Sequence, residues 1–235
     1  MSDPPRRTRP IVAIDGPAGA GKSTVARHLA EALGFILVDT GAIYRAVALS
    51  AKGAGIPWDD GARVGELARL LVARRGLRLE HDTNAGVRVR LDGEDVTSAI
   101  RAPDMGLGAS TVSAHGDVRA ALLEMQRQAG RTGGVVLEGR DIGTVVFPDA
   151  EVKFFLTARP EVRARRRFDE LVVKGERVTL EETLADVLRR DEQDTTRPVA
   201  PLRQATDATA IDNSDITIEE TVSRMVQGVR VRGGP

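Results

Sequence analysis

The chain has 235 residues, no cysteine, and equal numbers of basic and acidic side chains, with 34 Lys+Arg against 34 Asp+Glu. The length suits one compact domain with small insertions, and the absence of cysteine excludes disulfides, thiol nucleophiles and thiolate metal sites. The zero net charge gives no basic field for nucleic acid or a membrane surface.

Localisation signals are weak along the whole sequence. No apolar stretch approaches the roughly 18 residues expected of a membrane span. Arg6-Arg7 is similar to the start of a twin-arginine signal, but the apolar run after it covers only Ile11 to Ile14. We therefore expect a soluble, cytoplasmic and monomeric protein that binds neither nucleic acid nor membranes.

The N-terminal part reads as a strand–loop–helix–strand unit. Residues 1–8 are polar and rich in proline and arginine, which indicates a flexible leader. Ile11–Ile14 is a short β-branched apolar run, as in a buried parallel strand. After a glycine-rich turn, apolar residues from Val25 to Leu33 share one helical face up to Gly34, and residues 35–38 form the next strand. This order is typical of parallel sheets.

The rest of the chain continues this alternation with one interruption. Further buried strands are expected at residues 135–137, 152–156 and 209–212. Helical patterns cover residues 40–52, 62–74, 116–129, 160–173, 179–193 and 218–229. Residues 77–96 instead alternate apolar and polar residues around the turn Asp92-Gly93, which indicates a hairpin. The sequence thus predicts an α/β protein with three α/β/α layers, a five-stranded parallel sheet and a small antiparallel insertion.

The glycine-rich turn matches the phosphate-binding pattern G-x-x-x-x-G-K-[ST], the P-loop. Its residues are Gly16, Pro17, Ala18, Gly19, Ala20, Gly21, Lys22 and Ser23. The glycines let backbone N–H groups point at phosphate oxygens, and the following helix N-terminus adds its dipole. We expect the loop to bind ATP with Mg²⁺, with Lys22 on the β- and γ-phosphates and the metal on Ser23, a role that Thr24 could share. Switch GTPases, ATP-driven machines and small-molecule kinases all share this loop.

Three further segments distinguish among these classes of P-loop protein. Asp39-Thr40-Gly41-Ala42-Ile43-Tyr44-Arg45, read with Ile14-Asp15-Gly16-Pro17, resembles the opening of the bacterial cytidylate kinases. Glu138–Ala150 resembles the second signature of that family of nucleoside monophosphate kinases. Arg190-Asp191, Asp194 and Arg197 ahead of Ala200-Pro201-Leu202 resemble its third signature. The similarity runs from about Ile11 to Val229 in the family's order.

The resemblance implies transfer of the γ-phosphate of ATP to CMP or dCMP within one domain at residues 9–230. A core of residues 9–56 and 107–230 would carry an acceptor-binding insertion at about 57–106. A short lid over ATP would lie at about 160–178. Residues 1–8 and 231–235 would be flexible tails.

The resemblance also assigns the phosphate contacts. Arg45 and Arg140 would hold the acceptor phosphate with the Thr40 hydroxyl. The transferring phosphoryl group would be neutralised by Arg190, Arg197 and a lid arginine such as Arg166. The chemistry agrees, because a phosphate acceptor is already ionised at pH 7 and requires no general base. It requires two anions brought in line with their charge neutralised.

The resemblance also implies which residues contact the base of the acceptor. By resemblance Ser110, Arg119 and Asp141 would read cytosine, and Asp194 would reach the sugar. Cytosine offers an N4 amino donor beside the N3 and O2 acceptors, so a carboxylate suits the donor while arginine and serine suit the acceptors. Uracil has an oxygen in place of the amine and would be disfavoured.

Some positions depart from the family's pattern. Thr40 stands where familiar members have serine, and Glu138 where some have aspartate. Ser23 stands where some members have glycine. These departures leave the metal ligand open between Ser23 and Thr24.

Parts of the sequence also suit three other functions. A related kinase could act on another small acceptor, such as UMP, AMP or shikimate. A nucleotide switch is a second class, but the chain has no guanine-reading N-K-x-D segment. An RNA-binding factor is a third, and only seven aromatic residues with zero net charge argue against it.

Overall fold

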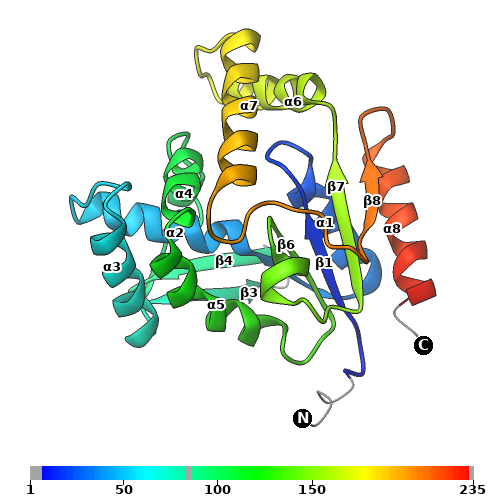
Figure 1. The fold of residues 1–235 in the computed structure, drawn as a ribbon, viewed down its shortest axis with the longest axis horizontal. Helices are drawn as coiled ribbons and strands as arrows, with labels where there is room; N and C mark the ends of the chain where they lie inside the picture. Colours follow the sequence, from blue (N-terminus) through cyan, green and yellow to red (C-terminus); the bar gives the residue numbers. More distant parts are fainter. Residues whose placement is uncertain (1–6, 83–85, 233–235) are drawn as a thin grey trace. The chain divides into compact units, whose positions relative to one another are not determined.

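The computed structural model describes residues 7–82 and 86–232, and its strands form two sheets. Five strands form one sheet in the order β2-β6-β1-β7-β8, and three form the other in the order β3-β4-β5 (Figure 1). The chain divides into two compact units. The first contains the described residues up to Leu37, Gly130–Asp191 and those from Leu202 onward, and the second contains Val38–Ala129 and Glu192–Pro201.

The large sheet has the predicted parallel strands. Its members are β1 (Ile11–Asp15), β2 (Ile36–Asp39), β6 (Val135–Gly139), β7 (Val152–Thr157) and β8 (Thr209–Asp212). β1 pairs in parallel with β6 on one side and with β7 on the other. Every residue of β1 and β6 is buried, as their continuous apolar runs predict. The register sets Asp15 opposite Gly139, so the carboxyl ends of β1 and β6 coincide.

Helices α1 (Lys22–Leu33) and α8 (Ile218–Arg232) cover the sheet within the first unit. They contact one another, and their apolar faces share a core with β1, β6 and β7. Helix α1 ends at Gly34, which adopts a left-handed conformation with φ of 60° and donates its N–H to the Ala30 and Glu31 carbonyls. The predicted helix stop at Gly34 is confirmed.

Helices α6 (Pro160–Val173) and α7 (Leu180–Thr196) follow β7. Proline at the first position of α6 suits a helix start, because that N–H has no partner within the helix. Residues 174–179 connect the two helices, so the stretch expected to form a lid is mostly α6 (Figure 1).

The expected tails are partly described. Residues 1–6 and 233–235 lie outside the described residues. Arg7 donates to the Asp149 carboxylate at 2.6 Å and to Glu151 at 3.0 Å. Val231 and Arg232, which the sequence assigns to a tail, are the last residues of α8.

The second unit is built on helices around their own core. They are α2 (Thr40–Gly53), α3 (Gly61–Ala73), the short 3₁₀ helix η1 (Ala99–Arg101), α4 (Met105–Ser113) and α5 (Gly116–Gly130). The sequence did not predict α4, because two glycines and three hydroxyl residues weaken its helical pattern. Packing against α2 overrides that weak propensity.

Glycine is required where α4 meets α2. A Cβ on Gly108 would lie 2.9 Å from the Ala48 Cβ and 2.8 Å from the Trp58 ring. Trp58 is fixed there by an indole N–H bond to the Ala48 carbonyl at 2.9 Å. The tryptophan is therefore part of the packing of this unit.

The antiparallel sheet of the second unit consists of β3 (Leu77–Asp82), β4 (Gly86–Leu91) and β5 (Glu94–Asp95). Leu77 pairs with Leu91 and Leu79 with Val89 in the β3–β4 register. The predicted turn at Asp92-Gly93 joins β4 to β5, and both turn residues have positive φ, 50° and 93°. Residues 83–85 lie outside the described part of the chain.

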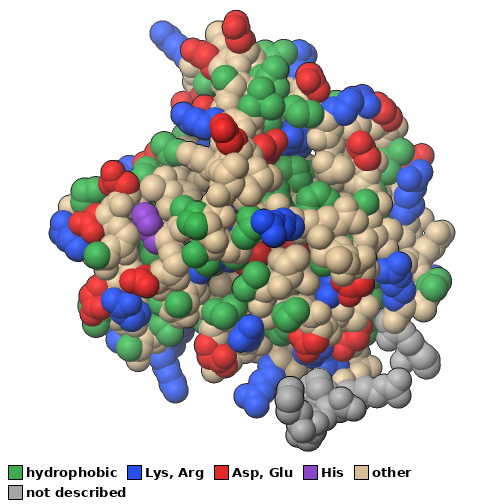
Figure 2. All heavy atoms as spheres, viewed as in Figure 1, with side chains coloured by type: hydrophobic (Ala, Val, Ile, Leu, Met, Phe, Trp, Pro, Cys, Tyr) green, Lys and Arg blue, Asp and Glu red, His purple; other side chains and the backbone are tan. Residues whose placement is uncertain are grey.

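The surface carries mixed charge. Basic and acidic side chains are interspersed over the face shown in Figure 2, in keeping with the balanced composition. Among the described residues, none of the helices combines the length and apolar character that crossing a membrane requires.

Substitution of Gly108 by alanine tests the close packing of α4 on α2. We expect Gly108→Ala to lower the free energy of unfolding by about 1–3 kcal/mol, because Ala48 or Trp58 must shift. Urea unfolding followed by circular dichroism measures this change. Gly53→Ala at the end of α2 is the control, since its Cβ would contact nothing within 4 Å. An equal effect of the two substitutions would contradict the packing argument.

Candidate functional site

The P-loop connects β1 to α1 and has the backbone conformation that its glycines allow. Gly16, Gly19 and Gly21 have φ of 153°, 76° and 81°. A Cβ on Gly16 would lie 1.9 Å from the Leu156 carbonyl oxygen, so only glycine fits there. Lys22 is the first residue of α1, and its Nζ donates to the Pro17 carbonyl at 2.7 Å. The lysine is thus folded back over the loop.

Ser23 has a partner that the sequence did not reveal. Its hydroxyl donates to Glu138 Oε2 at 2.9 Å, and Glu138 is a buried residue near the end of β6. A hydroxyl and a carboxylate are oxygen donors of the kind that Mg²⁺ prefers. In the described part of the chain no group of three or more His, Cys, Asp or Glu side chains could hold a metal. The donor set fits an ion bound by few protein ligands together with substrate phosphates.

Asp15 ends β1 directly before the P-loop and is buried, with 4% of its surface exposed. Its Oδ1 accepts the Ile142 N–H at 2.8 Å and its Oδ2 accepts the Gly143 N–H at 2.7 Å. The pKa of this carboxyl is raised to about 6, mainly by burial, and the charge of Asp141 acts in the same direction. The two backbone N–H bonds and Lys22 act in the opposite direction.

Two arginines of the first unit, Arg140 and Arg167, lie within electrostatic reach of a third, Arg190. Arg140 follows β6, Arg167 belongs to α6, and Arg190 belongs to α7. Burial, and then the fields of Arg167 and Arg140, lower the pKa of the Arg190 guanidinium, although Asp186 partly offsets them. The buried Nε of Arg190 has no hydrogen-bond partner among the described residues. Clustered cations with an unsatisfied donor are suited to an anion.

Arg163 joins α6, α7 and the P-loop. Its guanidinium forms a two-pronged ion pair with Asp191 at 2.9 and 2.5 Å. The same side chain donates to the Ala18 carbonyl of the P-loop at 3.1 Å and to Ala158 at 2.8 Å. Because Asp191 follows Arg190 directly, this partly buried pair fixes α7 where it carries Arg190.

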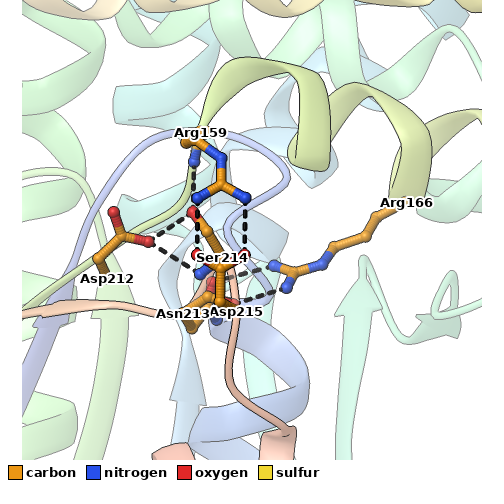
Figure 3. A network of polar contacts seen from close by, with 6 residues as sticks. All are labelled: Arg159, Arg166, Asp212, Asn213, Ser214 and Asp215. Atoms are coloured by element: carbon orange, nitrogen blue, oxygen red, sulfur yellow. Dashed lines mark hydrogen bonds and ion pairs between the residues drawn. The ribbon is translucent and has the colours of Figure 1, made fainter.

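Arg166, the lid arginine named from the sequence, has a different partner. Its two terminal nitrogens donate to the side-chain and backbone oxygens of Asn213 at 3.0 and 2.9 Å (Figure 3). Asn213 in turn donates to the Ala20 carbonyl at 3.0 Å. Arg159 is held nearby by the Asp215 carboxylate at 2.7 Å (Figure 3). Arg166 therefore stabilises the loop after β8 against the P-loop, whereas Arg167 forms an ion pair with Glu170 at 3.1 Å.

Arg45 is oriented by an aspartate within the second unit. The Asp39 carboxylate accepts from Arg45 at 2.6 Å and also caps α2 by accepting the Ala42 N–H at 3.0 Å. Thr40 is buried as the first residue of α2. The buried Arg45 Nε has no hydrogen-bond partner among the described residues. Residues 39–45 thus carry the Thr40 hydroxyl and the Arg45 guanidinium, which Asp39 holds in place.

Arg119 is a buried cation on α5. Its guanidinium lies 5.5 Å from the centre of the Tyr44 ring, a favourable cation–π distance. Gln126 donates to the Tyr44 hydroxyl at 3.4 Å, so the ring is also held on its polar side. Tyr44 supports a predicted site residue and is not merely core packing.

The remaining predicted residues of the second unit lie on α4 and at the end of α7. The Ser110 hydroxyl donates to Gln193 Oε1 at 3.3 Å, which links those two helices. Asp194 and Arg197 are both buried, and Arg197 Nη1 lies 3.9 Å from Asp194 Oδ1. Arg197 also donates to the Ala200 carbonyl at 2.7 Å.

The predicted site residues therefore fall into two groups, one in each unit. The first unit carries the P-loop and Thr24 with Arg140, Asp141, Arg166 and Arg190. The second carries Thr40, Arg45, Ser110, Arg119, Asp194 and Arg197.

Comparison with known proteins shows the family of the chain. A family model described as cytidylate kinase matches residues 12–231. The chain belongs to the cytidylate kinase family. A cytidylate kinase from Geobacter sp. (strain M21) is 57% identical over 222 residues, covering 94% of this chain and 93% of the relative. One from Geobacter sulfurreducens is 54% identical over 223 residues, with the same coverage of both chains.

A solved structure supports the fold of this cytidylate kinase family member. An uncharacterized protein from Eubacterium ventriosum superposes with a TM-score of 0.51 at 12% identity, covering 93% of this chain and 97% of that one. At that identity the likeness concerns the fold alone.

Sequence reasoning gave no role to Asp15, Glu138 or Asn213. Each lies at or just beyond the carboxyl end of a strand in the parallel sheet, β1, β6 or β8. Ligands of open parallel sheets bind at that edge, so their position along the strands was the available signal.

The pKa of Asp15 predicts how stability depends on pH. Its native value of about 6 lies above the ordinary 3.8, so the folded protein binds this proton more tightly than the unfolded chain. Its contribution to stability is therefore lost as pH rises toward and through 6. The unfolding free energy of Asp15→Asn minus that of the native protein should therefore increase by about 1 kcal/mol when the pH is raised from 5 to 7.5. Urea unfolding at both pH values tests this, and a constant or shrinking difference would contradict it.

Proposed function

We propose that this chain transfers the γ-phosphoryl group of ATP to CMP or dCMP, giving ADP and CDP or dCDP by direct in-line transfer. The observation that carries the proposal is the gathering of Arg140, Arg167 and Arg190 in the unit that contains the P-loop. The substrate class is supported by relatives named cytidylate kinase at 54–57% identity over nearly the whole chain.

The donor half of the site is the P-loop. Its N–H groups and Lys22 would hold the ATP phosphates. Ser23, together with Glu138, would hold Mg²⁺, which when bound neutralises phosphate charge. Of the two candidate metal ligands, Ser23 is favoured over Thr24 because its hydroxyl lies against a carboxylate.

The transferring group would be neutralised by arginines. Arg190 and Arg140 act at the phosphoryl group, with Arg197 as a further contributor. We assign the lid role to Arg167 in preference to Arg166. Arg167 contributes to the field at Arg190 and pairs, among the described residues, only with the exposed Glu170. Arg166 is instead bonded to the buried Asn213. Each charge-assisted contact to a developing negative charge contributes on the order of 10²-fold to rate.

The acceptor would be held by its phosphate and read by its base. Arg45, oriented by Asp39, and the Thr40 hydroxyl would contact the CMP phosphate together with Arg140. Asp141 would accept from the cytosine amine, while Ser110 and Arg119 would donate to its N3 and O2. Asp194 would reach the sugar. The acceptor phosphate is ionised at neutral pH, so the reaction needs no general base.

A panel of acceptors with ATP tests the proposed function directly. CMP and dCMP should be phosphorylated with kcat/KM at least about 100-fold above UMP and AMP, because uracil lacks the amine that Asp141 would accept from, and adenine lacks the O2 acceptor and is larger than a pyrimidine. Coupled ADP release measures each rate. Comparable rates on AMP and CMP would contradict the specificity, and ATP turnover without an acceptor would favour a switch.

Asp141 should affect the acceptor much more than the donor. We expect Asp141→Ala to lower kcat/KM for CMP by about 100-fold and to change the ATP dissociation constant less than threefold. Asp149→Ala, an exposed aspartate of the same signature segment, is the control. Equal losses for CMP and ATP would make Asp141 a structural residue.

Arg45 should affect both binding and rate. Arg45→Ala should raise the KM for CMP and lower kcat, each by about 10-fold or more, because a charge-assisted contact to the acceptor phosphate is lost. Arg63→Ala removes an exposed arginine of the same unit as a control. Unchanged steady-state kinetics would remove Arg45 from the site.

A further inference from the structure

We propose that Asp15 is a positioning residue for the nucleotide acceptor, because its carboxylate fixes the backbone that carries Arg140 and Asp141. This inference rests on the proposed function, in which those two residues hold the CMP phosphate and base. Asp15 itself belongs to the strand that leads into the donor loop, so it would connect the donor and acceptor functions of one unit.

The geometry starts from the strand register. Asp15 pairs with Gly139 at the carboxyl ends of β1 and β6, and the segment Arg140-Asp141 follows Gly139 directly. The chain then forms one turn of π-helix, η2 (Ile142–Val146), in which the N–H groups of Val145 and Val146 bond to the Asp141 carbonyl. Arg140 and Asp141 are thus the two residues between the end of β6 and the start of η2.

Asp15 supplies the cap of that turn. The first N–H groups of a helical turn have no partner within it. Here Ile142 and Gly143 donate to the two separate oxygens of Asp15, at 2.8 and 2.7 Å. The Asp141 side chain makes no capping bond to η2. The cap therefore comes from Asp15 of the neighbouring strand β1.

Two adjacent acceptors are a property of a carboxylate. Asparagine has the same shape but offers one oxygen and one NH₂ group, so one of the two N–H donors would face another donor. A buried donor without a partner is unfavourable and would displace the start of η2. The displaced residues would include the adjacent Asp141 and Arg140.

The carboxylate is also unfavourable for stability where it stands. It is buried beside Asp141, and its pKa is raised for that reason. A group that opposes stability while holding two backbone donors near a proposed binding segment is typical of a functional site. A residue selected for packing alone would be uncharged.

The experiment compares Asp15→Asn with a matched control at pH 8, where Asp15 is ionised. Glu151→Gln is that control, because the Glu151 carboxylate accepts the Ile11 N–H at 2.9 Å at the opposite end of β1. In Asp15→Asn we expect the KM for CMP to rise at least about 10-fold and the dissociation constant of a non-hydrolysable ATP analogue to change less than threefold. Glu151→Gln should leave both constants unchanged.

Amide hydrogen exchange provides a readout that does not depend on activity. The Ile142 and Gly143 amides should exchange at least about 10-fold faster in Asp15→Asn, because their acceptors are altered. Asp15→Glu, which keeps the charge but moves the carboxylate, should produce the same two changes and serves if Asp15→Asn does not fold.

The outcomes separate the two proposals. An unchanged KM for CMP in a folded Asp15 variant, or an equal loss of ATP affinity, overturns the positioning role. Unchanged exchange at Ile142 and Gly143 overturns it as well. Failure of the native protein to phosphorylate CMP would instead overturn the proposed function, while the exchange measurement would still test the backbone contact.

Discussion

Repulsion among arginines is the constraint on which the proposed site depends. Burial and the charges of Arg167 and Arg140 disfavour the charged form of Arg190, and Asp186 offsets them only in part. A bound anion would relieve this repulsion. A kinase that joins two phosphates must supply such positive charge, because the two anions repel each other as they approach. The ion pair of Arg163 with Asp191, bonded to the Ala18 carbonyl, holds α7 in place against that repulsion.

Carboxylates act mainly as organisers in this molecule. Asp39 orients Arg45 while capping α2, Asp191 anchors Arg163, and Asp15 caps η2 from the neighbouring strand. In each case a short bond of a carboxylate fixes a cation or a backbone segment that belongs to the proposed nucleotide site or is bonded to it. This division of labour explains how a chain with equal numbers of acidic and basic residues can still bind two polyanionic substrates.

The predictable features were those encoded locally. The strands of the parallel sheet, the end of α1 at Gly34 and the Asp92-Gly93 turn follow from periodicity and turn chemistry within a few residues. Helix α4 was missed because its stability comes from packing on α2 and not from its own sequence. The partners of Arg166, Ser23 and Asp15 depend on contacts between residues about 50 to 130 positions apart. No local pattern records such contacts.

The most direct test of charge neutralisation by Arg190 is the binding of a transition-state mimic. The affinity of Arg190→Lys for CMP together with ADP and aluminium fluoride can be measured by calorimetry beside its affinities for ATP and for CMP alone. Lysine keeps the charge but loses the planar fork, so the mimic should bind at least about 100-fold more weakly while each substrate alone changes less than threefold. An equal loss for all three ligands would contradict the account, because Arg190 would then stabilise the ground state or the fold and not the transferring phosphoryl group.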